Sequence, residues 1–350
     1  MKKIRFGFIG TGNISHYSAE AIAKHSNATL VAAQDPNKER RNDLADKFDI
    51  EHRFAEAKDL FACAEVDAVY IAVPNKFHAA LAIEAMQAGK HVILEKPFAM
   101  NTEQAEEVLA ISKKTGRVFT LGMNQRFMED SQKIKALASE GALGEIYYAK
   151  AFWLRREGIP KLGTWFGNKE LAGAGAINDI GVHLLDLCLH VMDNFKPVSV
   201  FGTMYTKFGN RGLGEGNWGI SDAENAVFDV DDLSTALIKM KNGATVSLEV
   251  SWAAHTGEHD KMDVQLFGTE AGASLYPAKL YKRNPAESGY QVIENMSIKP
   301  ALPHCERFHN FINHLINDEP LLVTGEQALA VQRILDAVSE SCRTGKSVDL

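Results

Sequence analysis

Short apolar runs alternate with longer amphipathic segments along the first part of the chain. The runs are typical of buried strands, and the segments between them, such as residues 37–48 and 78–88, are typical of helices. Strands that alternate with helices over about 120 residues predict a parallel, doubly wound α/β sheet, and ligands of such sheets bind at the carboxyl ends of the strands. The expected strands are residues 4–9, 28–34, 67–73, 91–94 and 118–123.

In the second part of the chain, strand-like segments follow one another. Residues 233–240 and 244–252 flank Asn242 and Gly243, a pair that favours a hairpin turn. Apolar and polar residues alternate along the second strand, so one face of its sheet should be buried and the other polar. Further strands are expected at 146–154 and 198–205, and helices at 127–139, 306–317 and 325–343.

Length and charge limit the fold and the partners. A chain of 350 residues is too long for one compact core, and we expect two domains, residues 1–123 and 124–350. The net charge of −7 provides no overall basic field for nucleic acid or anionic lipid, so neither is an expected partner. No apolar run approaches the roughly 20 residues of a membrane span.

The cysteine pattern and the first residues bear on the cellular compartment. Four widely spaced cysteines without a CxxC pair are typical of reduced thiols, which predicts a cytoplasmic protein. The first ten residues have the basic start of a signal peptide, but Gly7 and Gly10 interrupt the apolar run. We therefore expect this segment to form the first strand.

The first strand runs into a glycine-rich turn typical of dinucleotide-binding loops. Gly10 permits the turn, Gly12 lets the backbone approach a pyrophosphate, and the helix start at Asn13 and Ile14 offers N–H groups to the anion. Position 15, usually glycine or alanine, is serine, which is still small. Alone, such a pattern often marks only a tight turn.

A carboxylate follows the second strand. Asp35 is placed to bind the adenosine ribose and would repel a 2′-phosphate, which favours NAD over NADP. Arg40, with its basic neighbours Lys38 and Arg41, could instead hold that phosphate, although a solvated helix start is their commoner role. NAD is therefore the expected cofactor, and NADP is the alternative.

The next two strands also end in polar residues. Pro74 and Asn75 follow one strand, with His78 opening the helix behind them, and Glu95 and Lys96 follow the other. We expect all five to lie at the cofactor edge of the sheet. The proline after Lys96 fixes the backbone and can direct the lysine into the cleft, although most such lysines lie on the surface.

Asp179 and His183 stand four residues apart in a segment, residues 173–187, that is otherwise small or apolar. If the segment is helical, both side chains lie on one face, and a carboxylate shares a pocket with an imidazole. Such a pair is either catalytic or a buried pair that satisfies itself. We expect the catalytic centre here because the rest of the chain is typical of a protein that binds a redox cofactor.

The motifs GTGNIS, AVPNKFH, EKP and GAINDIGVHLLDL occur in the order of the glucose-fructose oxidoreductase and inositol dehydrogenase family (Gfo/Idh/MocA), which the whole chain resembles. The resemblance implies a Rossmann domain followed by an α/β domain with a large open, mostly antiparallel sheet. It implies NAD(P)-dependent oxidation or reduction of a sugar or polyol, with a catalytic set that falls on Lys96, Asp179 and His183. A homodimer or homotetramer through the C-terminal sheet is also implied.

Several residues of the second domain are suited to a sugar or to the cofactor. The indole of Trp165 can cover a ring face, and the guanidinium groups of Arg126 and Arg156 can form forked hydrogen bonds, although ordinary packing explains each residue equally well. Asn178 precedes the expected catalytic aspartate at a position that varies in the family and that we associate with substrate. His255 and His259 could bind a metal, but a loop at the cleft mouth is favoured.

The expected reaction transfers a hydride between a secondary alcohol and nicotinamide. His183 would accept the hydroxyl proton, because an imidazole with an ordinary pKa of ~6.5 is mostly neutral at pH 7. Lys96 would stabilise the developing alkoxide, and Asp179 would orient the imidazole. One alternative is a dihydrodiol dehydrogenase or another reductase acting on a non-sugar. Another is a regulator that binds NAD without turnover.

Overall fold

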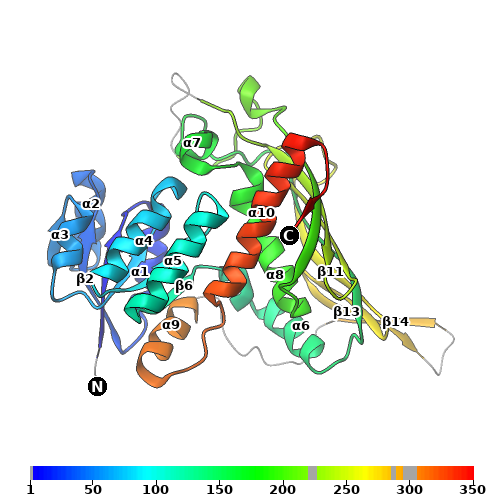
Figure 1. Ribbon diagram of the computed structural model, residues 1–350, viewed down its shortest axis with the longest axis horizontal. Helices are drawn as coiled ribbons and strands as arrows, with labels where there is room; N and C mark the ends of the chain where they lie inside the picture. The colour runs from blue at the N-terminus through cyan, green and yellow to red at the C-terminus, as the bar shows by residue number, and fades with distance from the viewer. Residues whose placement is uncertain (1–2, 220–226, 285–288, 295–305) are drawn as a thin grey trace. The chain divides into compact units, whose positions relative to one another are not determined.

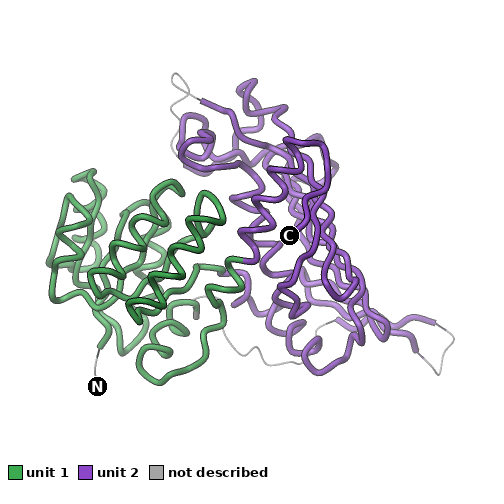
Figure 2. Tube along the Cα trace, in the orientation of Figure 1, with its two compact units in different colours: residues 1–123, 305–329 green, residues 124–304, 330–350 purple. Residues whose placement is uncertain are grey.

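The computed structural model describes residues 3–219, 227–284, 289–294 and 306–350. The chain forms two compact units (Figure 2): unit 1 contains residues 1–123 and 305–329, and unit 2 contains residues 124–304 and 330–350. Each unit is built on one sheet. Residues 305–329 pack with unit 1 although we expected them in the second domain with their neighbours in sequence.

Unit 1 contains the parallel sheet predicted from the alternating pattern. The six strands have the order β3-β2-β1-β4-β5-β6, and each pairs in parallel with its neighbour. Strand β3 was not predicted, because this edge strand has only three residues. The strands are β1 (Ile4–Ile9), β2 (Ala28–Gln34), β3 (His52–Phe54), β4 (Ala68–Ile71), β5 (His91–Leu94) and β6 (Phe119–Leu121).

Two helices of unit 1, α2 (Lys38–Lys47) and α5 (Thr102–Thr115), begin at asparagine side-chain caps. Asn37 accepts a hydrogen bond from the Arg40 amide, and Asn101 accepts one from the Gln104 amide, while the Gln104 side chain accepts one from the Met100 amide. The helices are α1 (Asn13–Ala23), α2 (Lys38–Lys47), α3 (Ala57–Ala62), α4 (His78–Gln87), α5 (Thr102–Thr115) and α9 (Glu306–Asn317), with a 3₁₀ turn η1 (Asn75–Phe77) before α4.

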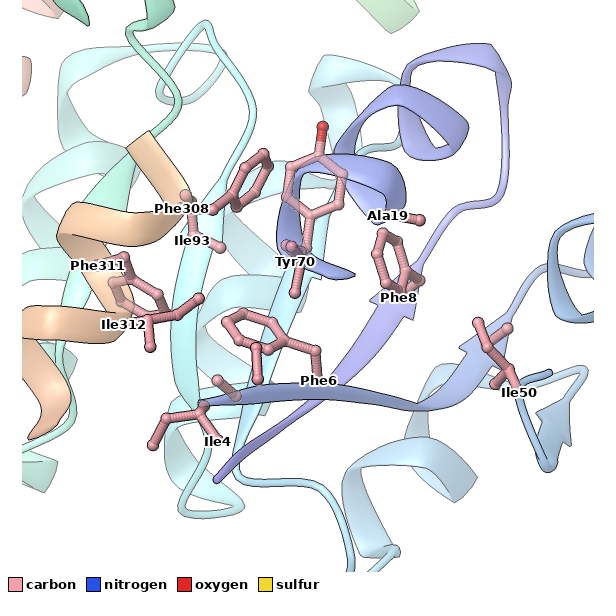
Figure 3. Close-up of a cluster of buried hydrophobic side chains, with 14 of the residues drawn as sticks. Ile4, Phe6, Phe8, Ala19, Ile50, Tyr70, Ile93, Phe308, Phe311 and Ile312 are labelled. Carbon is pink, nitrogen blue, oxygen red and sulfur yellow. The ribbon is translucent and has the colours of Figure 1, made fainter. Parts of the chain in front are cut away.

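Helix α9 completes the apolar core of unit 1. Figure 3 shows Phe308, Phe311 and Ile312 of α9 beside aromatic side chains of β1 and β4. The ring centroids of Phe311 and Phe6 lie 6.2 Å apart, and those of Phe308 and Tyr70 lie 5.4 Å apart. Full burial of one such side chain stabilises a fold by about 1.5–3 kcal/mol, which explains why α9 packs here.

Unit 2 contains the large, mostly antiparallel sheet. Its order is β14-β13-β12-β11-β7-β10-β9-β8-β15, and only β7 and β10 pair in parallel among the described strands. The predicted hairpin joins β9 to β10 through Gly243, which has a φ of 93°. The strands are β7 (Ile146–Arg155), β8 (Pro197–Tyr205), β9 (Leu233–Met240), β10 (Thr245–Ser251), β11 (Asp260–Gly268), β12 (Ala271–Leu275), β13 (Ala278–Asn284), β14 (Gly289–Ile293) and β15 (Val348–Asp349).

The helices of unit 2 gather on one face of this sheet (Figure 1), where Val246, Leu248 and Val250 are completely buried. On the opposite face, Phe201 and Leu237 are about half exposed. The helices and turns are η2 (Asn124–Phe127), α6 (Glu129–Ser139), η3 (Trp165–Gly167), α7 (Lys169–Ala172), η4 (Ile177–Gly181), α8 (Val182–Met192), η5 (Gly209–Arg211) and α10 (Gly325–Thr344), of which residues 330–344 belong to unit 2. Within the described residues, no helix has the length and apolar character that a membrane crossing requires.

Candidate active site

The glycine-rich turn after β1 is closed by contacts that explain its sequence. Gly10 has a φ of 84°, and a Cβ at this position would lie 2.2 Å from the carbonyl oxygen of Ala72. Only glycine fits there. The hydroxyl of Ser15 donates a hydrogen bond of 2.8 Å to the Gly10 carbonyl, so the serine at the family's glycine or alanine position ties the turn to α1.

The second glycine of the turn faces open space. A Cβ at Gly12 would meet no atom within 4 Å, and Gly12 caps α1 without a side-chain hydrogen bond. The helix therefore starts at Asn13 and Ile14 with main-chain N–H groups beside a space that a larger residue would fill. These residues fit a pyrophosphate, because helix N-termini stabilise anions and the missing side chain permits close approach.

Asp35 anchors the same turn. One carboxylate oxygen accepts hydrogen bonds from the amide and hydroxyl of Thr11, at 2.9 and 3.1 Å, and the other accepts one from the Asn37 amide at 2.8 Å. An ionised carboxylate has about four acceptor sites, so Asp35 keeps capacity for a ribose hydroxyl. Arg40 lies exposed in the first turn of α2, while Arg41 donates to the Asp35 carbonyl.

His78 joins the segments that follow β4 and β5. Its Nε2 lies 2.9 Å from the carbonyl oxygen of Val73, just before Pro74 and Asn75, and its Nδ1 lies 2.8 Å from the carbonyl oxygen of Pro97. The ring is 1% exposed, and this burial lowers the pKa of His78. His78 therefore fixes the backbone next to two of the predicted cofactor-edge residues, Pro74 and Lys96.

In unit 2, Asp179 and His183 are the accessible positions of a buried segment. Every residue from 177 to 190 is buried except these two, which have intermediate exposure. The indole Nε1 of Trp252 donates a hydrogen bond of 2.9 Å to Oδ2 of Asp179. A carboxylate held in this way, with a partly exposed imidazole one turn further along, is suited to proton transfer.

The backbone around Asp179 differs from the α-helix that we expected over residues 173–187. Residues 177–181 form a π-helical turn, and α8 begins at Val182. The buried carboxylate of Asp231 accepts hydrogen bonds from the amides of Gly175 and Ile177, at 2.6 and 2.9 Å. These bonds fix the start of the wider turn, which is a frequent feature of functional sites.

Two family models and a known enzyme match this chain over most of its length. Residues 4–123 match the GFO_IDH_MocA model, described as an oxidoreductase family with an NAD-binding Rossmann fold, and residues 131–274 match the GFO/IDH/MocA C-terminal domain. The chain is 32% identical over 350 residues to D-glucoside 3-dehydrogenase of Escherichia coli (strain K12), covering 99% of this chain and 97% of that protein. The chain belongs to the GFO/IDH/MocA oxidoreductase family.

Solved structures of similar fold extend the comparison. An NAD-binding protein from Listeria innocua is 26% identical, covers 99% of this chain and 97% of its own, and has a TM-score of 0.81. Levoglucosan dehydrogenase in complex with NADH and levoglucosan has a TM-score of 0.86 with 99% of each chain covered; at 22% identity this likeness shows the fold alone. The protein is thus an NAD(P)-dependent oxidoreductase with the family's two-sheet architecture.

Arg126 differs from our expectation that it binds substrate. In this GFO/IDH/MocA protein its side chain is completely buried, and Nε and Nη2 donate to the two carboxylate oxygens of Asp186 at 2.8 and 2.6 Å. Its guanidinium also lies over the Phe195 ring. A buried arginine needs such a partner, so this residue and Asp186 neutralise each other in the interior of unit 2.

The other three predicted residues of unit 2 have local partners. Arg156 donates to the carbonyl oxygens of Thr256 and Gly257 and so fixes the loop before β11. Asn178 is 7% exposed and donates to the Ala172 carbonyl at 3.2 Å. Trp165 is partly exposed and stacks on Phe166, with ring centroids 3.8 Å apart.

The segment that contains His255 and His259, for which a metal site was the less favoured interpretation, makes contacts with other side chains. His255 packs against Phe208, and the acids near His259 pair with basic side chains, Asp260 with Arg155 and Glu258 with Lys261. Among the residues that the structure describes, no group of three or more His, Cys, Asp or Glu side chains is arranged to hold a metal ion.

Two residues that support the site were not identified from the sequence. Trp252 appeared only as the last apolar position of a strand, and Asp231 belongs to no motif. Both lie more than 50 residues from Asp179 along the chain: Trp252 bonds the Asp179 carboxylate, and Asp231 bonds the amides of Gly175 and Ile177 that precede it. Only their residue types indicated a structural role, because a buried acid or indole nearly always has a hydrogen-bond partner.

Proposed function

We propose that the protein oxidises a secondary hydroxyl of a glycoside or a related sugar, with NAD as the hydride acceptor. The likeness to D-glucoside 3-dehydrogenase carries this proposal, because it extends over nearly the whole of both proteins. The carbinol C–H bond breaks and its hydride passes to nicotinamide, while the hydroxyl proton passes to a protein base. The products are a ketosugar, NADH and a proton. The third carbon of the sugar ring is the proposed site of oxidation.

Three residues perform the chemistry in this proposal. His183 accepts the hydroxyl proton, and Lys96 donates a hydrogen bond to the same oxygen and stabilises its developing negative charge. Asp179 orients the imidazole or holds a neighbouring hydroxyl. The hydrogen bond from Trp252 supports this role, because it fixes one carboxylate oxygen of Asp179.

The remaining residues bind the two reactants. The proposed cofactor residues are Gly10, Gly12, Asn13, Ile14, Asp35, Arg40, Pro74, Asn75, His78, Glu95, Lys96 and Trp165. NAD supplies the hydride acceptor, and the carboxylate of Asp35 favours it over NADP. Asn178 and Arg156 are the proposed substrate contacts. Arg126 has no place in this set, because its guanidinium is engaged by Asp186.

The test is NADH formation from a panel of sugars. Methyl glucosides, levoglucosan and inositols are supplied with NAD or NADP, and NADH or NADPH is followed by absorbance. Methyl β-D-glucoside deuterated at the third carbon should transfer its label to NADH, which mass spectrometry detects. Its 3-deoxy analogue, which lacks the reacting hydroxyl, should give no NADH. Label remaining in the sugar would refute oxidation at this carbon.

Variants then test the residue roles. His183→Ala should lower kcat by about 10² to 10⁴, as expected for loss of a general base. His52→Ala provides a control, since this residue lies in the edge strand β3 and pairs with Glu65. Equal rates in the two variants would remove His183 from the mechanism. Saturable NADH binding by the wild type without turnover on any substrate would favour a regulator.

We also infer a homodimer or homotetramer that forms through the unit 2 sheet. The register places Phe201, Leu237, Phe267 and Tyr281 on the face opposite α8, and each is at least 38% exposed. An exposed apolar face of this kind is typical of an interface. Leu237→Asp should reduce the sedimentation coefficient toward the monomer value. An unchanged assembly would exclude this face.

The cysteines support a cytoplasmic location. Cys63, Cys188 and Cys342 are unpaired thiols, and Cys305 lies outside the described residues. Free thiols persist in reducing compartments. Fractionation of cells that produce the protein should recover it with cytoplasmic markers, and recovery with a secreted fraction would contradict this assignment.

A further inference from the structure

Four side chains of unit 1 form a closed ring of hydrogen bonds, which we call the Glu95 ring: Ser18, Tyr70, Glu95 and Arg307. Arg307 Nη2 donates to the Ser18 hydroxyl at 3.2 Å, Ser18 donates to the Tyr70 oxygen at 2.9 Å, and Tyr70 donates to Glu95 Oε1 at 2.6 Å. Arg307 Nη1 closes the ring with a contact of 2.8 Å to the same Glu95 oxygen. Each hydroxyl both donates and accepts, so the bonds reinforce one another.

The Glu95 ring is buried and balanced in charge. Tyr70 is completely buried, Ser18 is 1% exposed and Glu95 is 8% exposed. Burial raises the pKa of Tyr70 well above its usual value, so the phenol stays protonated and donates. Burial opposes the charged guanidinium, but Glu95 and Tyr70 outweigh this effect and raise the pKa of Arg307. An arginine cation thus neutralises the Glu95 anion inside the unit.

The ring joins elements that are far apart in sequence. Its members come from α1, β4, the residue after β5, and α9 (Figure 1). Arg307 also donates to the carbonyl oxygen of Gly122 after β6, at 3.1 Å, and its guanidinium lies over the Phe308 ring at 4.7 Å. Figure 3 shows the Tyr70 side chain, with its hydroxyl oxygen, beside the side chain of Phe308. Helix α9 is therefore fastened to three parallel strands at the edge where this fold binds its ligands.

The anchored glutamate directly precedes the proposed catalytic lysine. Glu95 is held by the ring and by a main-chain bond of 2.9 Å to the Ile71 carbonyl. On the other side of Lys96, the Pro97 carbonyl lies 2.8 Å from His78 Nδ1. The backbone of Lys96 is therefore held between two fixed neighbours. A lysine side chain has four flexible carbons, so its ammonium can be placed reproducibly only if the backbone is fixed.

We propose that Arg307 is a positioning residue for Lys96, acting through Glu95. The inference rests on the proposed function, because it takes Lys96 as the group that stabilises the alkoxide. Arginine is suited to this role, since its planar fork contacts Glu95, Ser18 and the Gly122 carbonyl together. Disruption of the ring should impair the chemical step and leave substrate binding largely intact.

Kinetic variants separate positioning from general stability. Arg307→Met should lower kcat at least about tenfold and change KM and the Kd for NADH less than about threefold, because transition-state stabilisation is lost without loss of ground-state contacts. Arg307→Lys keeps the countercharge and should recover part of kcat. Tyr70→Phe removes one donor to Glu95 and leaves Arg307 in place. Tyr70→Phe should lower kcat less than Arg307→Met does, and it tests the proposal if Arg307→Met does not fold.

Arg5→Met is the matched control. Arg5 forms a forked ion pair with Asp67 in the same unit, at the amino ends of β1 and β4, away from the ligand-binding edge. This variant loses an ion pair of the same unit, with side chains 37% and 23% exposed against 10% and 11% for Arg307 and Glu95, and it should keep its kcat. If both arginine variants lose kcat to the same degree, or if Arg307→Met raises KM or the Kd for NADH with kcat unchanged, the positioning role is refuted.

Hydrogen–deuterium exchange gives a result that does not depend on turnover. In the cofactor-free protein, the peptide covering residues 95–100 should exchange at least about threefold faster in Arg307→Met than in the wild type, since its anchor is lost. Arg5→Met should leave that peptide unchanged. Wild-type exchange in Arg307→Met would overturn the inference. A wild type without sugar turnover would refute the proposed function, whereas faster exchange would still establish that Arg307 holds this segment.

Discussion

The buried pair of Arg126 and Asp186 gives the most direct test of the interior of unit 2. The two hydrogen bonds are 2.8 and 2.6 Å long, and the side chains are 0% and 1% exposed. Arg126→Met keeps much of the side-chain volume but removes the countercharge of Asp186. Loss of one partner from a buried ion pair costs about 3–5 kcal/mol, so this variant should lose that much free energy of unfolding.

The double variant Arg126→Met with Asp186→Leu removes both charges together. Replacement of a buried pair by apolar residues is often neutral, so the double variant should recover most of the lost stability. Urea unfolding followed by tryptophan fluorescence measures this effect. The assay reports on unit 2, because all four tryptophans of the chain, at positions 153, 165, 218 and 252, lie in that unit.

The same variants decide between a structural and a substrate-binding arginine. If Arg126 acts only in the fold, the folded double variant keeps KM within about threefold of the wild type, because no ground-state contact is lost. A KM raised at least about tenfold in a stable double variant would restore the substrate-binding role. The ion-pair argument would be refuted if Arg126→Met lost less than about 1 kcal/mol of its free energy of unfolding, or if the double variant did not recover that free energy.

Further predictions concern the turn, the pH response and the site. Gly10→Ala should lower Tm, because its Cβ would collide with the Ala72 carbonyl oxygen. Gly12→Ala should leave the Tm of the cofactor-free protein unchanged, because its Cβ meets no protein atom. The same Cβ would occupy the space proposed for the pyrophosphate, so NADH binding in a fluorescence titration should weaken about tenfold. Burial, with Arg126 and Lys135, lowers the pKa of His190 to about 2, so below pH 6.5 the unfolded chain binds a proton that the folded chain does not. Stability should therefore fall by about 2 kcal/mol from pH 7 to pH 5, and His190→Leu should remove that part of the urea-unfolding pH dependence. Trp252→Phe removes the donor to Asp179 and should lower kcat about tenfold in the NADH assay; an unchanged kcat would exclude the orienting role.

The sequence predicted the fold where local pattern determines it. Alternating strands and helices indicated the parallel sheet, and Asn242 with Gly243 located the β9–β10 hairpin. The three-residue strand β3 was missed because it is too short for a periodic signal. The π turn before α8 was also missed. Asp231, which accepts hydrogen bonds at the start of this turn, stands more than 50 residues later in the chain, so local pattern carries no sign of the contact.

In the candidate site, the proposed catalytic residues could be predicted from the sequence, whereas the residues that support those side chains could not. Lys96, Asp179 and His183 belong to compact motifs, so a short stretch of sequence is enough to propose them. Their supports have no such signature, because a buried partner needs only the right chemistry and the right place in space. Arg126 was assigned to substrate because an arginine near an aromatic residue has the same appearance in sequence whether a carboxylate or a sugar faces it. The two hydrogen bonds from Arg126 to Asp186 favour the structural role, and this pairing is found only once the chain is folded.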